Sequence, residues 1–168
     1  MHWTEFERAA PELAEVARER IEKDQVILLG TIRKDGSPRI SPVEPDIANG
    51  RLYLGMIPQS TKALDLQRDP RCVVHGLIFD RMATGGEVKL RGRGLEIHDP
   101  GEKAAYGEAI FKRIGWRPEE PYHLFAIDIE SAALFQTGEE TRLLTQWSKK
   151  EPVRKYRVYI DNRKEEID

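Results

Sequence analysis

The sequence predicts a mainly β member of the α+β class, a closed or nearly closed antiparallel barrel with helices packed outside it. Two observations predict this class. Seven or eight short runs rich in apolar and β-branched residues are separated by turn residues, and only two or three segments have helical spacing. The chain has 168 residues, which is enough for one ordinary domain with a real core.

The composition argues against several classes of function. The chain has 27 lysines and arginines against 29 aspartates and glutamates, and its formal charge of −2 gives no bulk attraction to nucleic acid or to an anionic membrane. Its one cysteine, Cys72, cannot form an internal disulfide, and no run approaches the roughly 18 apolar residues that span a bilayer. The first residues lack the basic start and apolar run of a signal peptide, so we expect a cytoplasmic protein.

An N-terminal helix is expected over residues 1–24. Thr4 and Glu7 have the spacing of a capping box, and apolar residues then recur at helical spacing. Pro11 interrupts this pattern. It either kinks the helix or begins a second one at Ala10, because proline is tolerated in a first turn.

Three strands joined by two tight turns are expected next, as an antiparallel meander. Asp35-Gly36 and Asn49-Gly50 supply the positive φ angles that tight hairpin turns need. The strands are predicted at residues 26–32, 39–44 and 51–57.

The rest of the barrel is expected to combine further strands with two helices. Ser60 caps one helix, which Asp69-Pro70 ends, and Asp99 caps a second, which ends near Gly115. The further strands are predicted at residues 71–79, 87–97, 122–129, 132–137 and 143–147.

The last segment of the chain is strongly charged. Tyr156, Val158 and Ile160 alternate within it, so it either adds an edge strand or forms a mobile tail. We therefore divide the chain into an N-terminal helix at 1–24, a barrel domain at 25–147 and a charged C-terminal tail at 148–168.

Two neighbouring segments have the pattern of a binding site. The run 39–43 is flanked by prolines, which cannot donate to a strand ladder; it is either a plain edge strand or one that offers unpaired backbone groups to a planar heterocycle. The run 58–62 leads into the N-terminus of a helix. Free backbone amides, two hydroxyls and the Lys62 ammonium come together there, and such groups bind phosphate. The alternative there is an ordinary serine cap beside a solvated lysine.

Three cations recur at period two in a later strand. Lys89, Arg91 and Arg93 must share one face of that strand, where like charges repel unless an anion or acidic partners lie opposite. This face is either an anion-binding wall or a solvated outer face with acidic neighbours such as Glu87. The four histidines show no metal-ligand spacing, so no metal site is expected.

Together these motifs resemble the flavin-binding split-barrel proteins of the pyridoxamine 5'-phosphate oxidase family. Residues 31–43 resemble the first hairpin of that family, and residues 60–71 resemble its Ser-x-Lys helix with the Asp-Pro-Arg turn that follows. The order and spacing of the two motifs also match. The resemblance covers roughly residues 26–99 and implies a split β-barrel of antiparallel strands with short outer helices.

The resemblance also implies roles for individual residues along the first and third strands. Arg39 would face the ribityl-phosphate side of a flavin, and the ring edge would meet Ser41, Pro42 and Val43. Met56 falls where the third strand of the family contacts the cofactor.

The remaining implied contacts involve the phosphate and a possible cofactor tail. Ser60, Thr61 and Lys62 would hold the phosphate, although many family members carry arginine at the position of Thr61. Lys89, Arg91 and Arg93 would line a cationic groove for a deazaflavin with a polyglutamate tail.

The function that the resemblance implies is an oxidoreductase that depends on flavin mononucleotide (FMN), bound at the interface of a homodimer. The alternatives are a reductase that uses the deazaflavin coenzyme F420, a non-catalytic flavin-binding protein, and a split barrel that serves only as an interaction module. Residues 153–158 do not match the segment with which the namesake enzyme grips its substrate, so pyridoxamine phosphate oxidation is not implied. The sequence marks no catalytic residue and no substrate.

Overall fold

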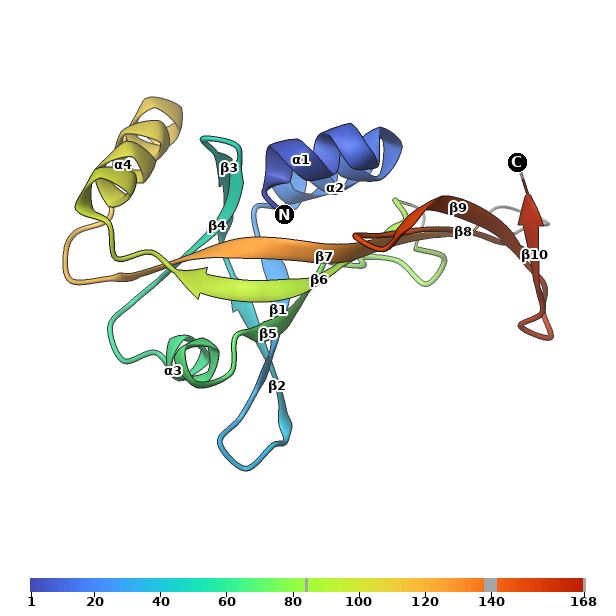
Figure 1. Ribbon diagram of the computed structural model, residues 1–168, viewed down its shortest axis with the longest axis horizontal. Helices are drawn as coiled ribbons and strands as arrows, with labels where there is room; N and C mark the ends of the chain where they lie inside the picture. Colours follow the sequence, from blue (N-terminus) through green and yellow to red (C-terminus); the bar gives the residue numbers. More distant parts are fainter. Residues whose placement is uncertain (84, 138–141, 168) are drawn as a thin grey trace.

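The computed structural model describes residues 1–83, 85–137 and 142–167, and its main feature is one antiparallel sheet (Figure 1). Hydrogen-bonded neighbours follow the order β10-β9-β8-β7-β6-β5-β1-β2, and β4 joins β3 to β7. The strands are β1 Ile27–Ile32, β2 Pro38–Val43, β3 Pro45–Ala48, β4 Arg51–Met56, β5 Arg71–His75, β6 Glu87–Glu96, β7 His123–Thr137, β8 Arg142–Ser148, β9 Glu151–Val158 and β10 Lys164–Ile167. The helices are α1 Trp3–Ala9, α2 Pro11–Asp24, α3 Thr61–Arg68 and α4 Pro100–Ile114.

The N-terminal segment forms two helices that Ala10 separates. Pro11 occupies the first position of α2, so the second of the two predicted alternatives is correct. The predicted capping box of Thr4 and Glu7 is wrong. The helix begins earlier, and the backbone amide of His2 donates to the side chain of Glu5 at 2.7 Å instead.

The predicted three-strand meander is only partly correct. The turn at Gly36, with φ of 86°, joins β1 to β2 as expected. The chain then leaves the ladder at Glu44, and it is β3 that pairs with β4 through the Asn49-Gly50 turn. Pro42 and Pro45 flank this break, and proline cannot donate to a continuous ladder.

The barrel is split between β2 and β4. Within the described residues, β2 pairs only with β1, and β4 pairs with β3 and β7, so no ladder closes the sheet. The fold is thus an α+β split barrel, and the expectation of a closed or nearly closed barrel is corrected to an open one. The opening lies beside β2, in which Pro38 and Pro42 have no amide to donate to a closing ladder.

β7 is a single strand of 15 residues where two strands were predicted. One edge of β7 pairs with β6 along much of its length. The other edge of β7 pairs first with β4 and then with β8. The register between β6 and β7 skips Glu130, which marks a bulge rather than a turn. Gly92 lies opposite this bulge, where a Cβ atom would stand 2.2 Å from the carbonyl oxygen of Asp128.

The charged C-terminal segment extends the sheet, which is the first of its two predicted alternatives. β9 pairs with β8, and β10 pairs with β9. Tyr156 and Val158 lie in β9, whereas Ile160 lies beyond its end and is 90% exposed. The Lys155 ammonium lies 2.7 Å from the carboxylate of Glu12, which ties β9 to α2.

The main core lies between α1, α2 and the face of the sheet that they cover (Figure 1). Trp3 and Phe6 of α1 are fully buried, and Phe6 contacts Trp147 of β8 with ring centroids 5.2 Å apart. A smaller cluster under α4 contains Tyr53 and Tyr106. None of the described helices is long and apolar enough to cross a membrane.

Candidate functional site

The start of α3 has the features of an anion-binding helix terminus. Ser60 is the N-cap as predicted, and its hydroxyl accepts from the amide of Ala63 at 3.4 Å. The amides of Thr61 and Lys62 occupy the first turn, where no helical carbonyl precedes them. Thr61 is exposed and Lys62 is half-buried. Within the described residues, the Lys62 ammonium has no ion-pair partner.

The buried carboxylate of Asp65 joins α3 to the first hairpin. It accepts from Nε of Arg39 at 2.6 Å, from the hydroxyl of Thr31 at 3.0 Å and from Arg68 at 3.0 Å. Only 4% of the Asp65 side chain is exposed. Burial alone would raise its pKa, but the hydrogen bonds from Arg39, Arg68 and Thr31 outweigh burial and lower the pKa. Asp65 therefore holds a charged, fixed position between β1, β2 and α3.

The other predicted residues of β2 and β4 have different surroundings. Ser41 is half-buried and Pro42 is exposed, whereas Val43 lies in the main core. Met56 is only 4% exposed and belongs to the same core. Among the predicted residues of β2 and β4, only Arg39 has a described hydrogen bond to a residue of α3, namely Asp65. The cofactor contacts of Ser41, Pro42, Val43 and Met56 stay predictions.

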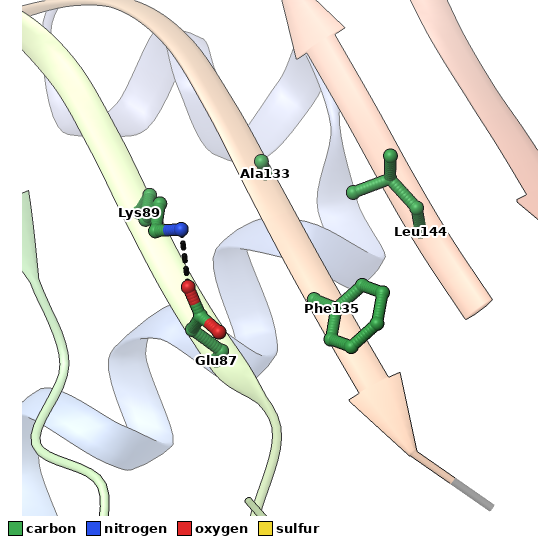
Figure 2. A pocket seen from close by; sticks show the side chains of 5 residues that line it. All are labelled: Glu87, Lys89, Ala133, Phe135 and Leu144. Carbon is green, nitrogen blue, oxygen red and sulfur yellow. Dashed lines mark ion pairs between the residues drawn. The ribbon is translucent and has the colours of Figure 1, made fainter. Parts of the chain in front are cut away.

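The cations of β6 share one exposed face, as their spacing predicts. Figure 2 shows Lys89 turned along its strand toward Glu87, with which it forms an ion pair. His75 of β5 lies 3.3 Å from the same carboxylate. Lys89, with a smaller effect from His75, holds the pKa of Glu87 below its usual range although burial opposes this. Arg91 and Arg93 have no such pairing within the described residues.

A hollow of about 470 Å³ lies on this exposed face between β6 and β9. Its rim includes Lys89 and Arg91 on one side and Arg154 and Tyr156 on the other. A smaller hollow of about 250 Å³ adjoins it and shares Lys89, Ala133 and Leu144 with it (Figure 2). Sequence reasoning did not predict that Arg154 and Tyr156 line the same hollow as Lys89. The alternation of Tyr156, Val158 and Ile160 predicted an edge strand as one of two alternatives, but no local signal tells which strands lie between β9 and β6.

The histidines contact acidic and backbone groups. His123 lies 2.7 Å and His98 3.5 Å from Glu96, and Gln67 donates to this carboxylate at 2.9 Å. Burial raises the pKa of Glu96, but the bonds from Gln67 and His123 outweigh it, and the pKa is lowered. In the part of the chain that the structure describes, no three histidine, cysteine or acidic side chains are grouped to hold a metal ion.

Comparison with known proteins identifies relatives of this fold. A family model described as pyridoxamine 5'-phosphate oxidase matches residues 13–136. A crystal structure from Clostridium acetobutylicum, of a protein related to general stress protein 26 and of the pyridoxinephosphate oxidase family, has a TM-score of 0.59 and 15% identity, over 83% of this chain and 96% of that chain. General stress protein 26 from Bacillus anthracis has a TM-score of 0.51 and 23% identity, over 70% of this chain and 92% of that chain.

A heme binding protein from Mycobacterium smegmatis shares the same fold. Its TM-score is 0.62 at 16% identity, and the match covers 81% of this chain but only 57% of that chain. No protein with a curated description matches the chain. Identities this low show a shared fold, and the match to the family model over residues 13–136 shows the family.

Proposed function

Because the chain belongs to the pyridoxamine 5'-phosphate oxidase family, we propose that it is an oxidoreductase that binds FMN between two copies of itself. The observation that carries the proposal is the start of α3. The free amides of its first turn and the positive end of the helix dipole lie together there with the Lys62 ammonium, which has no ion-pair partner among the described residues. This arrangement suits a phosphate monoester such as that of FMN.

Arg39 adds a further cation near this helix. Its Nε donates to Asp65, which lies one turn beyond Thr61 on α3. A guanidinium has five N–H donors, so the ion pair leaves others available to an anion. Asp65 thus acts as a positioning residue that fixes Arg39 against the helix. These residues fit the phosphate of a flavin.

Exposed apolar side chains flank the same region. Ile40 is 72% exposed on β2, Ile57 is 75% exposed just before α3, and Leu64 is 39% exposed within it. Apolar side chains gathered around a polar site commonly mark a surface that a ring system or a partner chain covers. They support a second copy of the chain as the other wall of the flavin site.

The bound flavin would supply hydride transfer, and the protein residues would supply binding and orientation. In this division of labour Ser60 keeps the first turn of α3 ordered, and Lys62 and Arg39 hold the phosphate. Asp65 accepts from Arg39 throughout and stays ionised.

Titration of the purified protein with FMN, followed by visible absorption, tests the proposal. We expect saturable binding with one flavin per chain. Lys62→Ala should weaken binding by about 10- to 100-fold, the range for a hydrogen bond to a charged group. Lys34→Ala, a change of an exposed lysine in the β1–β2 turn, is the matched control and should bind as wild type does. Failure of the wild type to bind any flavin would refute the proposal.

Two further readouts separate the alternatives. The deazaflavin F420 is favoured by the exposed row of Lys89, Arg91 and Arg93, and its binding should then weaken when Lys89 and Arg91 are changed to glutamate. A Soret band after addition of hemin would instead show that the protein binds heme, as the name of the structurally similar protein from Mycobacterium smegmatis states for that protein. Oxidation of the reduced cofactor by an added electron acceptor distinguishes an enzyme from a non-catalytic flavin-binding protein.

A further inference from the structure

Glu96 and His123 form a half-buried pair that has no role in the candidate phosphate site. The Nδ1 atom of His123 lies 2.7 Å from one carboxylate oxygen of Glu96, and Gln67 of α3 donates to the other oxygen at 2.9 Å. The side chains of His123 and Glu96 are 18% and 16% exposed. The carboxylate is thus held by α3 and in turn holds one edge of the imidazole.

The contact with Glu96 determines which ring nitrogen of His123 is left free. Burial would raise the pKa of Glu96, but the hydrogen bonds from Gln67 and His123 outweigh burial and lower the pKa. An ionised carboxylate can only accept, so Nδ1 of His123 carries the proton of a neutral imidazole and Nε2 keeps a lone pair. Nε2 has no hydrogen-bond partner among the described residues. A carboxylate on Nδ1 and a free Nε2 are the arrangement in which an imidazole transfers protons.

The strand register places this imidazole beside the path that leads to α3. His123 is the first residue of β7, and it pairs with Met56, the last residue of β4. Directly paired residues of neighbouring strands share one face of the sheet, so the two side chains lie side by side. Three residues separate Met56 from the N-cap Ser60, a path of at most about 14 Å. A flavin mononucleotide with an extended ribityl chain is longer than this path.

The course of α3 brings the pair and the candidate phosphate site to the same end of the barrel. α3 follows β4 and leads to β5, and β7 and β6 lie between those two strands in the sheet (Figure 1). The hydrogen bond from Gln67 to Glu96 fixes the helix against the end of β6. A flavin held by its phosphate at the start of α3 is therefore long enough to bring its ring to His123.

The reduction of an organic acceptor by a reduced flavin consumes a hydride and a proton. We propose that His123 is the proton donor of this reaction, with Glu96 and Gln67 as positioning residues; the proposal rests on the proposed function. The reduced flavin gives its hydride to one atom of the acceptor, and the imidazolium gives its Nε2 proton to a second atom. Oxidised flavin, the reduced acceptor and a neutral imidazole remain. Histidine suits this role because its side chain ordinarily changes charge near neutral pH.

Stopped-flow oxidation of the FMN-loaded, dithionite-reduced protein tests the proposal with two acceptors. Dichlorophenolindophenol takes up a hydride and a proton, whereas ferricyanide takes up an electron alone. His123→Gln should slow oxidation by the dye about 100-fold, the lower end of what general acid–base catalysis contributes, and should leave oxidation by ferricyanide unchanged. His98→Gln is the matched control, because His98 lies 3.5 Å from the same carboxylate and is 79% exposed. It should keep the wild-type rates with both acceptors.

NMR of the histidine ring nitrogens gives a readout that does not depend on turnover. In the neutral form, His123 should carry its proton on Nδ1. Glu96→Gln should allow the other tautomer, because a carboxamide can donate as well as accept, and it should slow oxidation by the dye more than oxidation by ferricyanide. Addition of oxidised FMN should shift the Nε2 resonance of His123 and leave that of His98 in place.

Equal slowing of both acceptors by His123→Gln would overturn the proposal, since the substitution would then act on the flavin or the fold and not on a proton. A wild-type rate with the dye, or an Nε2 resonance that FMN does not shift, would also overturn it. Flavin binding with either result would leave the proposed function standing, whereas absence of flavin binding would refute both. Thermal melting checks folding; if His123→Gln melts early, Glu96→Gln keeps the imidazole and carries the same comparison of acceptors.

Discussion

Replacement of Asp65 by asparagine tests whether the contact between α3 and the first hairpin stabilises the fold. The substitution keeps the shape of the side chain and removes its charge. Arg39 and Arg68 then lose their carboxylate, and Thr31 keeps only a neutral partner. The helix and the hairpin would lose the charged group that joins them.

The size of the effect follows from burial. Removal of one partner from a buried ion pair costs about 3–5 kcal/mol, because the remaining charge is left uncompensated. The side chains of Arg39 and Arg68 are 22% and 37% exposed, so water can reach both after the substitution. We therefore expect Asp65→Asn to lower the free energy of unfolding by about 2–3 kcal/mol, less than a fully buried pair would lose. This corresponds to a fall in Tm of roughly 4–12 °C for a domain of this size.

Guanidinium unfolding monitored by tryptophan fluorescence measures this difference. Asp69→Asn is the matched control, since Asp69 pairs with Arg71, whose side chain is 65% exposed. Arg71 holds the pKa of Asp69 at about 2, yet an exposed pair of this kind contributes little to stability. Equal unfolding free energies for Asp65→Asn and Asp69→Asn would refute the reasoning.

The pH dependence gives an independent check. The pKa of Asp65 is lowered in the folded state, so its stabilising effect is complete above the ordinary aspartate value of 3.8 and is lost as the pH falls through the lowered pKa. The difference in unfolding free energy between wild type and Asp65→Asn should therefore be constant near neutral pH and shrink below that value. A difference that persists at the lowest pH would show that the charge is not its source.

Three further predictions concern packing. Gly92→Ala should lower the free energy of unfolding by about 2 kcal/mol or more, because the added Cβ would meet the Asp128 carbonyl oxygen. Gly107→Ala in α4 adds a Cβ with no atom within 4 Å and should raise the free energy of unfolding by up to about 1 kcal/mol. Equal effects of the two substitutions in guanidinium unfolding would contradict this. Phe6→Ala removes a fully buried ring and should cost about 3–5 kcal/mol by the same measurement. Burial raises the pKa of the Cys72 thiol to about 12, so Ellman's reagent at pH 8 should react with the unfolded protein and only slowly with the native one.

Local signals in the sequence predicted local structure well. Ser60 and Asp99 both cap the helices that were assigned to them, because a cap depends only on the residues within one turn of it. The Asn49-Gly50 turn was also predicted, since its positive φ angles are a property of those two residues. The exposed alternation of β6 followed from the period of a strand.

Non-local pairing was the part that the sequence could not supply. The polar pair at Glu130 and Ser131 reads as the end of a strand, but β7 continues through it because β6 pairs on both sides of the bulge. Asp65 reads as a solvated helix residue next to Leu64, yet Asp65 is buried and Leu64 is exposed. Nothing near Asp65 in the sequence indicates that cationic side chains will surround it. That fact depends on where β1 and β2 lie.

The Asp65 carboxylate explains why the first hairpin and the Ser-x-Lys helix indicate a binding site when they occur together, whereas either one alone is a weak indication. The hairpin supplies Arg39 and Thr31, and the helix supplies Asp65, Lys62 and the free amides of its first turn. A cation on a proline-rich edge strand has no fixed position by itself, and a single capped helix terminus attracts anions only modestly. Asp65 fixes Arg39 against the helix with an ion pair that is largely closed to water. The proposed phosphate site thus depends on a contact between two residues 26 positions apart, and on that proposal a change at Asp65 should weaken FMN binding even though the Asp65 carboxylate repels a phosphate.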